Sequence, residues 1–206
     1  MTGRPLLHEY SPSGNCYKVR LTAALLGIGI ERREYDILKG ETRTADFLAR
    51  VNANGRIPVL EVDGRFIPES NAACYYLADG SELIPKQRFD HADMLRWMFF
   101  EQYSHEPNIA TLRFWIRYLG TEKLSDQQRV QISGKRQAGE AALKIMNDQL
   151  TGRDWFVGDA ISLADICLYA YTHVAGEAEF NLRHYPKIIE WMGRMEEQPG
   201  YVPMHS

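Results

Sequence analysis

The sequence has few of the residues and patterns on which several large protein classes depend. Its three cysteines, at positions 16, 74 and 167, are too few for a disulfide framework and include no C-x-x-C pair. Its six histidines show no zinc-site spacing. No apolar run approaches the ~18 residues of a membrane span, and the first residues contain no apolar signal region. The net charge of −3 provides no basic surface for nucleic acid. We therefore expect a soluble, cytoplasmic protein with reduced thiols, without a metal, a membrane segment or a nucleic-acid partner.

The patterns that are present divide the 206 residues into two regions. Over residues 1–80, strand-like and helix-like segments alternate in the order β-α-β-α-β-β-α, which predicts an α/β domain whose first two strands are parallel. Residues 81–87 are predicted to be a linker. Strand patterns disappear in residues 88–206, which are predicted to form an all-α helical bundle. The expected elements are strands at 6–10, 30–37, 59–62 and 65–67, and helices at 16–26, 44–50, 70–77, 91–119, 125–150, 161–174 and 186–197.

A tight hairpin preceded by a proline occupies residues 57–67. Asp63-Gly64 between two β-prone runs predicts a two-residue turn, because both turn positions favour positive φ. Pro58 begins the first strand, where it cannot donate to the ladder, and it restricts Ile57 to extended geometry. Two interpretations stay open. Pro58 is a simple strand-start proline, or Ile57 offers free backbone groups to an incoming extended peptide.

An acid–hydroxyl pair follows the hairpin. Ser70 is a favourable N-cap for the apolar run that begins at Ala72. A helix start attracts a carboxylate, and Glu69 beside it offers an anion to an ammonium group. The pair suits the amino-acid end of a small peptide, although an ordinary N-cap next to a surface glutamate would have the same sequence.

The loop SPSGNC joins the first strand to the first helix. A thiolate held at a helix N-terminus has a lowered pKa, and donors in this loop can hold it by charge-assisted hydrogen bonds. The candidate donors are Ser11, Ser13, Asn15 and the neighbouring Tyr10. Cys16 is a candidate nucleophile in its own right. The alternative is that Ser13 or Asn15 only caps the helix.

The second region contains structural patterns. Ser162-Leu163-Ala164-Asp165 has the form of an N-capping box, which predicts a buried Asp165 that accepts backbone N–H groups. Pro107 is expected to kink or break the helical run at 91–119. The core positions expected in the helix at 125–150 are Ala138, Ala141, Ile145 and Leu150.

Taken together, the chain resembles a bacterial cytosolic-type glutathione transferase over essentially its whole length. The matching segments are SPSGNCYKVRLTAALLGI, NANGRIPVLEVDG, ESNAACYYLAD, FVGDAISLADICLYA and YPKIIEWMGRM. The resemblance implies a thioredoxin-like first domain with a mixed, four-stranded sheet, a helical second domain and a cis Ile57–Pro58 bond. It also implies a homodimer and a role in detoxification.

The resemblance assigns a glutathione site to the first domain. It implies that the backbone of Ile57, next to Pro58, pairs with the cysteinyl part of glutathione, and that Glu69 and Ser70 hold the γ-glutamyl end. The residues expected at the glycyl carboxylate are Arg56, Lys39 and Arg43.

The residue that acts on the sulfur stays open. Ser13 falls where serine-type members keep the hydroxyl that stabilises the thiolate. The chain departs from the C-x-x-C of thioredoxins, because Ser13 stands three residues before Cys16. It also departs from Cys-type transferases, whose cysteine comes earlier in the loop. Asn15 resembles residues used by disulfide-reducing members.

The leading functional hypothesis is conjugation. Glutathione binds as a co-substrate, its thiol pKa is lowered, and the thiolate attacks a small, hydrophobic electrophile. One alternative is glutathione-dependent disulfide reduction or peroxidase chemistry at the same site. Another is a non-catalytic glutathione-binding or scaffold protein. The side chains expected to line the pocket for the second substrate are Phe99, Tyr103, Phe114 and Trp115, together with Tyr10.

Overall fold

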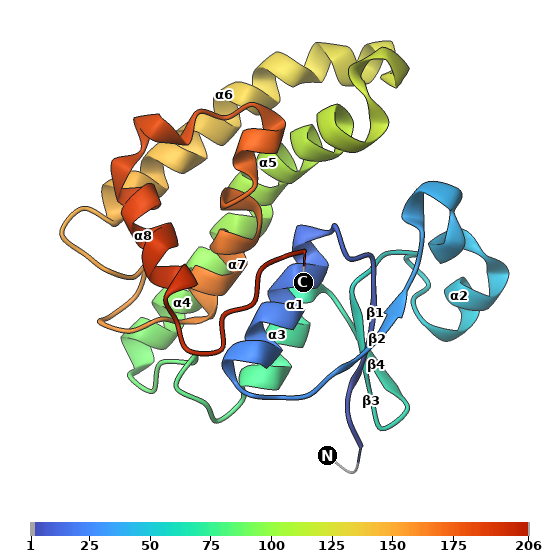
Figure 1. Cartoon of the computed structure of the whole chain (residues 1–206), viewed down its shortest axis with the longest axis horizontal. Coiled ribbons are helices and arrows are strands. Elements are labelled where there is room, and N and C mark those ends of the chain that lie inside the picture. The colour runs from blue at the N-terminus through green and yellow to red at the C-terminus, as the bar shows by residue number, and fades with distance from the viewer. Residues whose placement is uncertain (1–2, 206) are drawn as a thin grey trace. The chain divides into compact units, whose positions relative to one another are not determined.

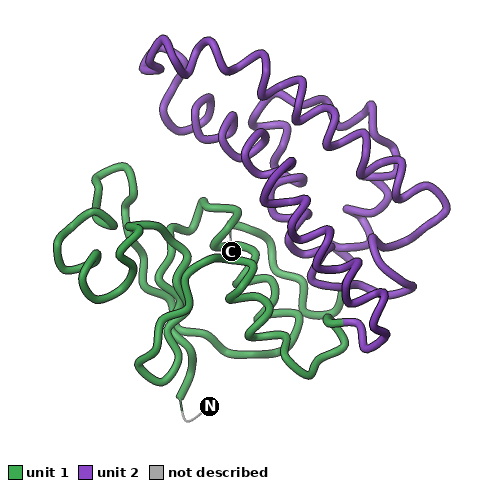
Figure 2. Tube along the Cα trace, turned by 180° about the vertical axis from the view of Figure 1, so that it is seen from behind, with its two compact units in different colours: residues 1–84, 198–206 green, residues 85–197 purple. Residues whose placement is uncertain are grey.

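The computed structural model describes residues 3–205, which form two compact units. One unit comprises residues 3–84 together with 198–205, and the other is Pro85–Glu197 (Figure 2). The division falls inside the segment predicted as a linker. The C-terminal segment belongs to the first unit because Tyr17 donates its hydroxyl to Val202 O at 2.7 Å and Arg20 donates to Met204 O at 3.0 Å.

The first unit is a sheet with helices on both faces. The strand order is β2-β1-β3-β4, in which β1 and β2 are parallel and the other pairs antiparallel. Figure 1 shows α1 and α3 on one side of the sheet and α2 on the other. The predicted mixed, four-stranded sheet is confirmed. The strands are β1 (Leu6–Glu9), β2 (Glu31–Glu34), β3 (Val59–Val62) and β4 (Arg65–Pro68), and the helices are α1 (Gly14–Leu25), α2 (Ala45–Arg50) and α3 (Ser70–Ala78).

The core of this unit lies between the central strands and the pair α1 and α3. Leu7 on β1, Leu60 on β3, Val19 on α1 and Ala73 on α3 are all fully buried. Removing such apolar surface from water supplies about 25 cal/mol per Å², the main favourable term in folding. The edge strand β2 has the sequence ERRE and is exposed throughout, and its charges discourage pairing with another chain.

The segment from the proline to α3 is mostly as predicted. The turn residues Asp63 and Gly64 have φ of 48° and 73°, and the Ile57–Pro58 bond is cis. The predicted cap is wrong by one residue. Glu69, with φ 70°, is the N-cap of α3 and makes no side-chain cap bond, while Ser70 is the first helical residue. Ser70 does not cap its own helix because its hydroxyl is bonded to α1.

The second unit is helical, as predicted. The helical run does not stop at Pro107, because this proline lies in the first turn of α5, where its missing N–H is not needed. A π-helical segment, Glu101–His105, joins α4 to α5, and a second, Phe114–Leu119, follows α5. The helices are α4 (Arg88–Phe100), α5 (Glu106–Arg113), α6 (Asp126–Gln149), α7 (Leu163–Thr172) and α8 (Pro186–Glu196).

The helix α7 begins with the predicted capping box. Ser162 and Asp165 each bond the backbone N–H of the other with a side-chain oxygen. Asp165 is 0% exposed and also accepts from Phe156 N at 3.1 Å and from Trp191 Nε1 at 3.0 Å. Its carboxylate therefore joins three segments of the second unit.

The predicted core face of α6 is largely wrong. Ala138, Ala141 and Ile145 are exposed, and only Leu150 is buried. The observed core face includes Gly139, because a Cβ there would lie 2.5 Å from the ring of Phe180. The other residues of the buried face are Ala142, Leu143 and Met146.

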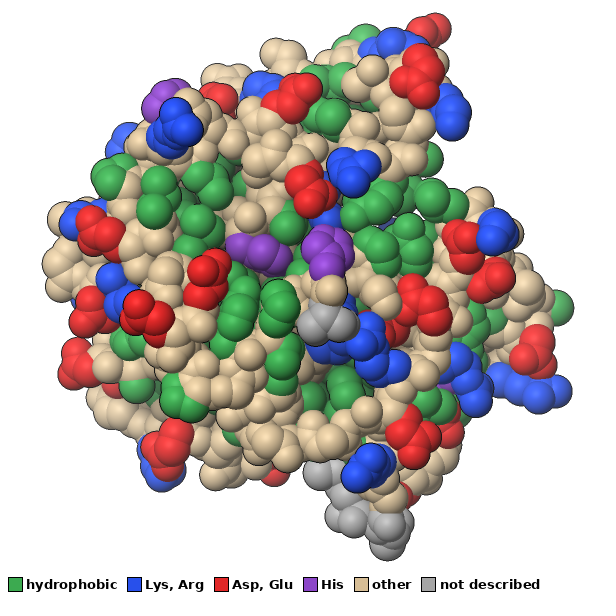
Figure 3. Space-filling model, viewed as in Figure 1, with side chains coloured by type: hydrophobic (Ala, Val, Ile, Leu, Met, Phe, Trp, Pro, Cys, Tyr) green, Lys and Arg blue, Asp and Glu red, His purple; other side chains and the backbone are tan. Residues whose placement is uncertain are grey.

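The surface carries both signs of charge. On the face drawn in Figure 3, basic and acidic side chains are interspersed with hydrophobic ones. Among residues 3–205, no helix is long and apolar enough to cross a bilayer.

Candidate active site

Three segments of the first unit meet at one edge of its sheet. Strand β1 pairs with β3 so that His8 is opposite Val59, which puts the cis bond beside the end of β1, where the loop at 10–13 begins. Strand β3 pairs with β4 so that Val59 is opposite Pro68, which puts residues 69–70 at the same edge. The register therefore gathers the loop, the cis bond and the start of α3.

The backbone of Ile57 offers one donor and one acceptor. Within the described chain, neither its N–H nor its C=O is hydrogen-bonded to another residue. The preceding segment is held in place, because Arg43 donates to Asn54 O and the Asn52 amide donates to Arg56 O, each at 2.9 Å. Open backbone groups on a fixed segment are what an added peptide strand requires.

The three basic side chains expected at the glycyl carboxylate differ in their surroundings. Arg56 is exposed and adjoins Ile57. Arg43 is bonded to a carbonyl of the same loop, and the ammonium of Lys39 lies 3.0 Å from the Asp36 carboxylate. That carboxylate raises the pKa of Lys39 by a hydrogen bond and by its charge. Arg56 is thus the cation best placed for a ligand beside Ile57, and its role stays a prediction.

The start of α3 combines an exposed acid with a connected hydroxyl. Glu69 has φ 70° and ψ 115°, a conformation that costs a non-glycine residue about 1–3 kcal/mol and that clusters at ligand-binding sites. Ser70 donates its hydroxyl to Asn15 Oδ1 at 3.2 Å. This bond joins the start of α3 to the start of α1 and so brings two of the predicted site segments into contact.

Ser13 caps α1 in extended geometry. Its Oγ accepts the N–H of Cys16 at 3.4 Å, and its own N–H donates to Tyr10 O at 2.8 Å. The cap bond uses an oxygen lone pair, so the hydroxyl proton can rotate either toward the Cys16 sulfur or toward a ligand. A ligand thiolate at this position would meet an O–H donor together with the positive end of a helix.

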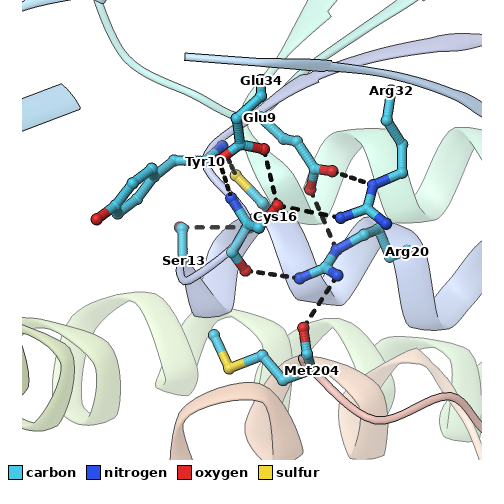
Figure 4. A network of polar contacts seen from close by, with 9 residues as sticks. Glu9, Tyr10, Ser13, Cys16, Arg20, Arg32, Glu34 and Met204 are labelled. Carbon is cyan, nitrogen blue, oxygen red and sulfur yellow. Dashed lines mark hydrogen bonds and ion pairs between the residues drawn. The ribbon is translucent and has the colours of Figure 1, made fainter. Parts of the chain in front are cut away.

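Cys16 lies behind this loop, not in it. It is fully buried, and its sulfur accepts the N–H of Tyr10 at 3.4 Å (Figure 4). Burial raises the pKa of the Cys16 thiol to about 12, and the bonds from Tyr10 and Ser13 oppose the rise only in part. A buried neutral thiol argues against Cys16 as the nucleophile.

We expect the native protein to resist alkylation at Cys16. All three cysteines are free and buried, so iodoacetamide should label none of them at neutral pH, and all three once urea has unfolded the chain. Mass spectrometry of the labelled protein checks this. Rapid labelling of native Cys16 would show that its thiolate is reactive, and Cys16 would then again be a candidate nucleophile.

Ser11 is held by hydrogen bonds to neighbouring side chains. Its N–H and its hydroxyl both donate to the Glu34 carboxylate at 2.7 Å, and its hydroxyl accepts from Arg32 at 3.1 Å. Its carbonyl accepts from Arg20 at 2.7 Å. All the polar groups of Ser11 are thus engaged in holding the loop, which disfavours it as a thiolate donor.

A network of ion pairs centred on the buried Glu9 holds the loop in place (Figure 4). Glu9, the last residue of β1, is fully buried and pairs with Arg20 at 3.1 Å and with Arg32. Arg20 also donates to Ser11 O and Met204 O, so one guanidinium ties β1, the loop and the C-terminal segment together. The Tyr10 side chain points away from this network.

The aromatic side chains predicted for the second substrate belong to the second unit. Phe99 and Tyr103 are 63% and 84% exposed, Phe114 is half-buried, and Trp115 is buried with Lys135 5.7 Å from its ring centre. Exposed aromatics are available to a ligand, whereas Trp115 serves packing. Their assignment to a substrate pocket stays a prediction.

Sequence reasoning missed three residues around the site, namely Glu9, Lys18 and Arg20. A spacing signal was present, because α1 carries two basic residues on faces that also contain its apolar positions. In the part of the chain that is described, no group of three or more His, Cys, Asp or Glu side chains is arranged as a metal site.

Comparisons with known proteins agree on one family. Residues 7–79 match the model of the glutathione S-transferase N-terminal domain, and residues 108–199 match that of the C-terminal domain. A crystal structure of a glutathione S-transferase from Pseudomonas fluorescens aligns with TM-score 0.93 and 44% identity over 99% of this chain and 100% of that one. Maleylacetoacetate isomerase of Dictyostelium discoideum is 28% identical over 97% of this chain and 92% of the relative. Elongation factor 1-gamma of Artemia salina is 29% identical over 84% of this chain and 40% of the relative.

Proposed function

The chain belongs to the glutathione S-transferase family, and we propose that it activates the thiol of glutathione for attack on a small hydrophobic electrophile. The observation that carries the proposal is the meeting, at one sheet edge, of the open Ile57 backbone, the start of α3 and the Ser13 hydroxyl. Glutathione has a group to match each part: its peptide backbone suits Ile57, its zwitterionic end suits the start of α3, and its thiol suits the Ser13 hydroxyl.

In the proposed complex, glutathione lies along Ile57 with its ammonium on Glu69 and its α-carboxylate at the start of α3. The thiol releases its proton to solvent, and the Ser13 hydroxyl donates to the resulting thiolate. Lowering a thiol pKa from about 8.5 to about 6.5 takes roughly 3 kcal/mol, which one charge-assisted hydrogen bond and the field of α1 can supply. A sulfur lone pair then forms a C–S bond with the electrophile, whose leaving group departs with the bonding electrons.

Two measurements test the proposal. Titration calorimetry measures the binding of glutathione, and ultraviolet absorbance across pH measures the ionisation of its bound thiol. We expect binding and an apparent thiol pKa well below the free value of about 8.5. Absence of binding would favour a scaffold protein. Binding without a lowered thiol pKa would leave a glutathione-binding protein that does not activate the thiol.

Family membership alone does not specify the reaction, since matched relatives include an isomerase and an elongation factor by name. The second candidate reaction is reduction of a small disulfide at the same site, with Asn15, whose amide oxygen accepts from Ser70 at the start of α3, as the candidate donor to the sulfur. Comparing the rate of turnover with an aryl halide to the rate with a small disulfide distinguishes the two reactions.

We also propose a cytoplasmic homodimer. The three buried, free cysteines suit a reducing compartment. Phe89, Phe99 and Tyr103 are exposed along α4 and the π-helical segment that follows it, and such aromatic surface is typical of protein interfaces. Light scattering after size exclusion should give twice the mass of one chain. A mass equal to that of one chain would refute the proposed dimer.

A further inference from the structure

Lys18 is a buried lysine that contacts the start of α3, and the proposed mechanism does not use it. Its side chain, on α1, is 0% exposed, whereas long charged side chains usually carry their head groups to water. The ammonium donates to Asn71 Oδ1 at 3.1 Å and to Ser70 Oγ at 3.4 Å. These two acceptors belong to the first two residues of α3.

Ser70 links this cation to the candidate ligand site. Its hydroxyl accepts from Lys18 and donates to Asn15 Oδ1. A hydroxyl that accepts from an ammonium is polarised and becomes a stronger donor. The free N–H groups at the start of α3 add a partial positive charge at the same place. The Lys18 side chain, the polarised hydroxyl and the helix terminus therefore all favour an anion at this place.

We propose that Lys18 is a positioning residue that, through Ser70, sets the preference of this site for the α-carboxylate of the γ-glutamyl group. This proposal rests on the proposed glutathione binding. When the ligand binds, the Ser70 hydroxyl turns from Asn15 to the carboxylate, while Lys18 keeps its bond to Ser70 Oγ. Because Lys18 is shielded from water, its attraction for the carboxylate is weakened less than that of a surface lysine.

Two ligands and two lysine variants test the proposal. The ligands are glutathione and an analogue in which γ-aminobutyrate replaces γ-glutamate, so that only the α-carboxylate is lost. Lys18→Met keeps the length and volume of the side chain and removes its charge. We expect it to weaken glutathione about tenfold to a hundredfold by calorimetry, and the analogue by no more than about threefold. Lys18→Arg should retain most of the preference for glutathione.

Lys144→Met is the matched control, because it removes an exposed lysine paired with Asp148 in the second unit. It should leave both affinities unchanged. Equal losses for both ligands in Lys18→Met, or no loss for either, would overturn the proposal. Wild type that does not bind glutathione at all would instead refute the proposed function itself.

A measurement on wild type avoids any folding defect in the variants. The Lys18 side-chain ammonium resonance should shift when glutathione is added and should shift much less with the analogue. The same shift with both ligands would contradict a role for Lys18 in sensing the carboxylate.

Discussion

Replacing Ser13 with alanine is expected to lower kcat/KM for conjugation at neutral pH about tenfold to a hundredfold. A hydrogen bond to a charged group contributes about 1.5–3 kcal/mol, so its loss raises the thiol pKa of bound glutathione by about 1–2 units. The field of α1 remains in the variant, which is why the loss is not larger. The deficit should shrink as pH rises past the thiol pKa, because thiolate then forms without the hydroxyl.

The effect of Ser13→Ala on stability has to be separated from its effect on the sulfur. Ser13 is also the N-cap of α1, and losing a cap costs about 1 kcal/mol. Ser125→Ala is the matched control, because Ser125 caps α6 in the second unit. It should cost similar stability without changing the thiol pKa. Ser13→Thr, which keeps both hydroxyl and cap, should retain most of the rate. A Ser13→Ala enzyme with unchanged rate and thiol pKa would remove Ser13 from catalysis.

Replacing Asp165 with alanine is expected to lower the free energy of unfolding by about 3–5 kcal/mol, or roughly 10 °C in Tm. The Asp165 carboxylate accepts from Phe156 N, from Trp191 Nε1 and from the N–H and hydroxyl of Ser162. In the variant these donors would be buried without an acceptor. Urea denaturation measures the loss. Asp148→Ala, which removes an exposed carboxylate paired with Lys144, should cost no more than about 0.5 kcal/mol.

The same residue gives a pH dependence with a definite sign. Burial raises the pKa of Asp165 from its ordinary 3.8 to about 6, against the bonds that favour ionisation. A carboxyl with a raised folded-state pKa stabilises most below its unfolded-state value, and this contribution is lost as pH rises to the folded-state value. The stability difference between wild type and Asp165→Asn should therefore narrow from about pH 4 to about pH 6. A difference that widens over this interval would contradict the raised pKa.

Local patterns predicted the parts of the fold that depend on a few neighbouring residues. Asp63-Gly64 is a turn because those two residues tolerate positive φ, and Ser162 with Asp165 is a capping box because the spacing lets each side chain reach the other's backbone. The strand–helix–strand order likewise predicted that the first two strands are parallel. Each of these features is decided within a few residues of the chain.

Contacts between distant segments accounted for the differences. Glu69 takes positive φ because the chain must turn from β4 into α3 at that residue, and no local pattern reports it. The face of α6 was misassigned because Gly139 marks a close approach of Phe180, whereas glycine alone in a helix suggests no partner. Glu9 and Arg20 pair across segments, so their burial follows only from the assembled sheet.

The candidate site divides in the same way. Ile57, Glu69 and Ser70 could be singled out from sequence because Ile57 precedes the proline before β3, and Glu69 and Ser70 stand at the start of α3. The loop offered five candidates for the sulfur, and only the three-dimensional contacts distinguish them. Ser11 is engaged with Glu34, and Cys16 is buried. Lys18 is easily missed in the sequence because a lysine in a helix is ordinarily exposed, and only its place among the apolar positions of α1 indicates burial.

The most direct test of the account is a crystal structure of the protein with glutathione bound. We expect the sulfur within about 3.5 Å of Ser13 Oγ, the cysteinyl backbone paired with Ile57, and the α-carboxylate at the start of α3. A sulfur held by Asn15 or Tyr10, or joined to Cys16, with the Ser13 hydroxyl turned away, would contradict it.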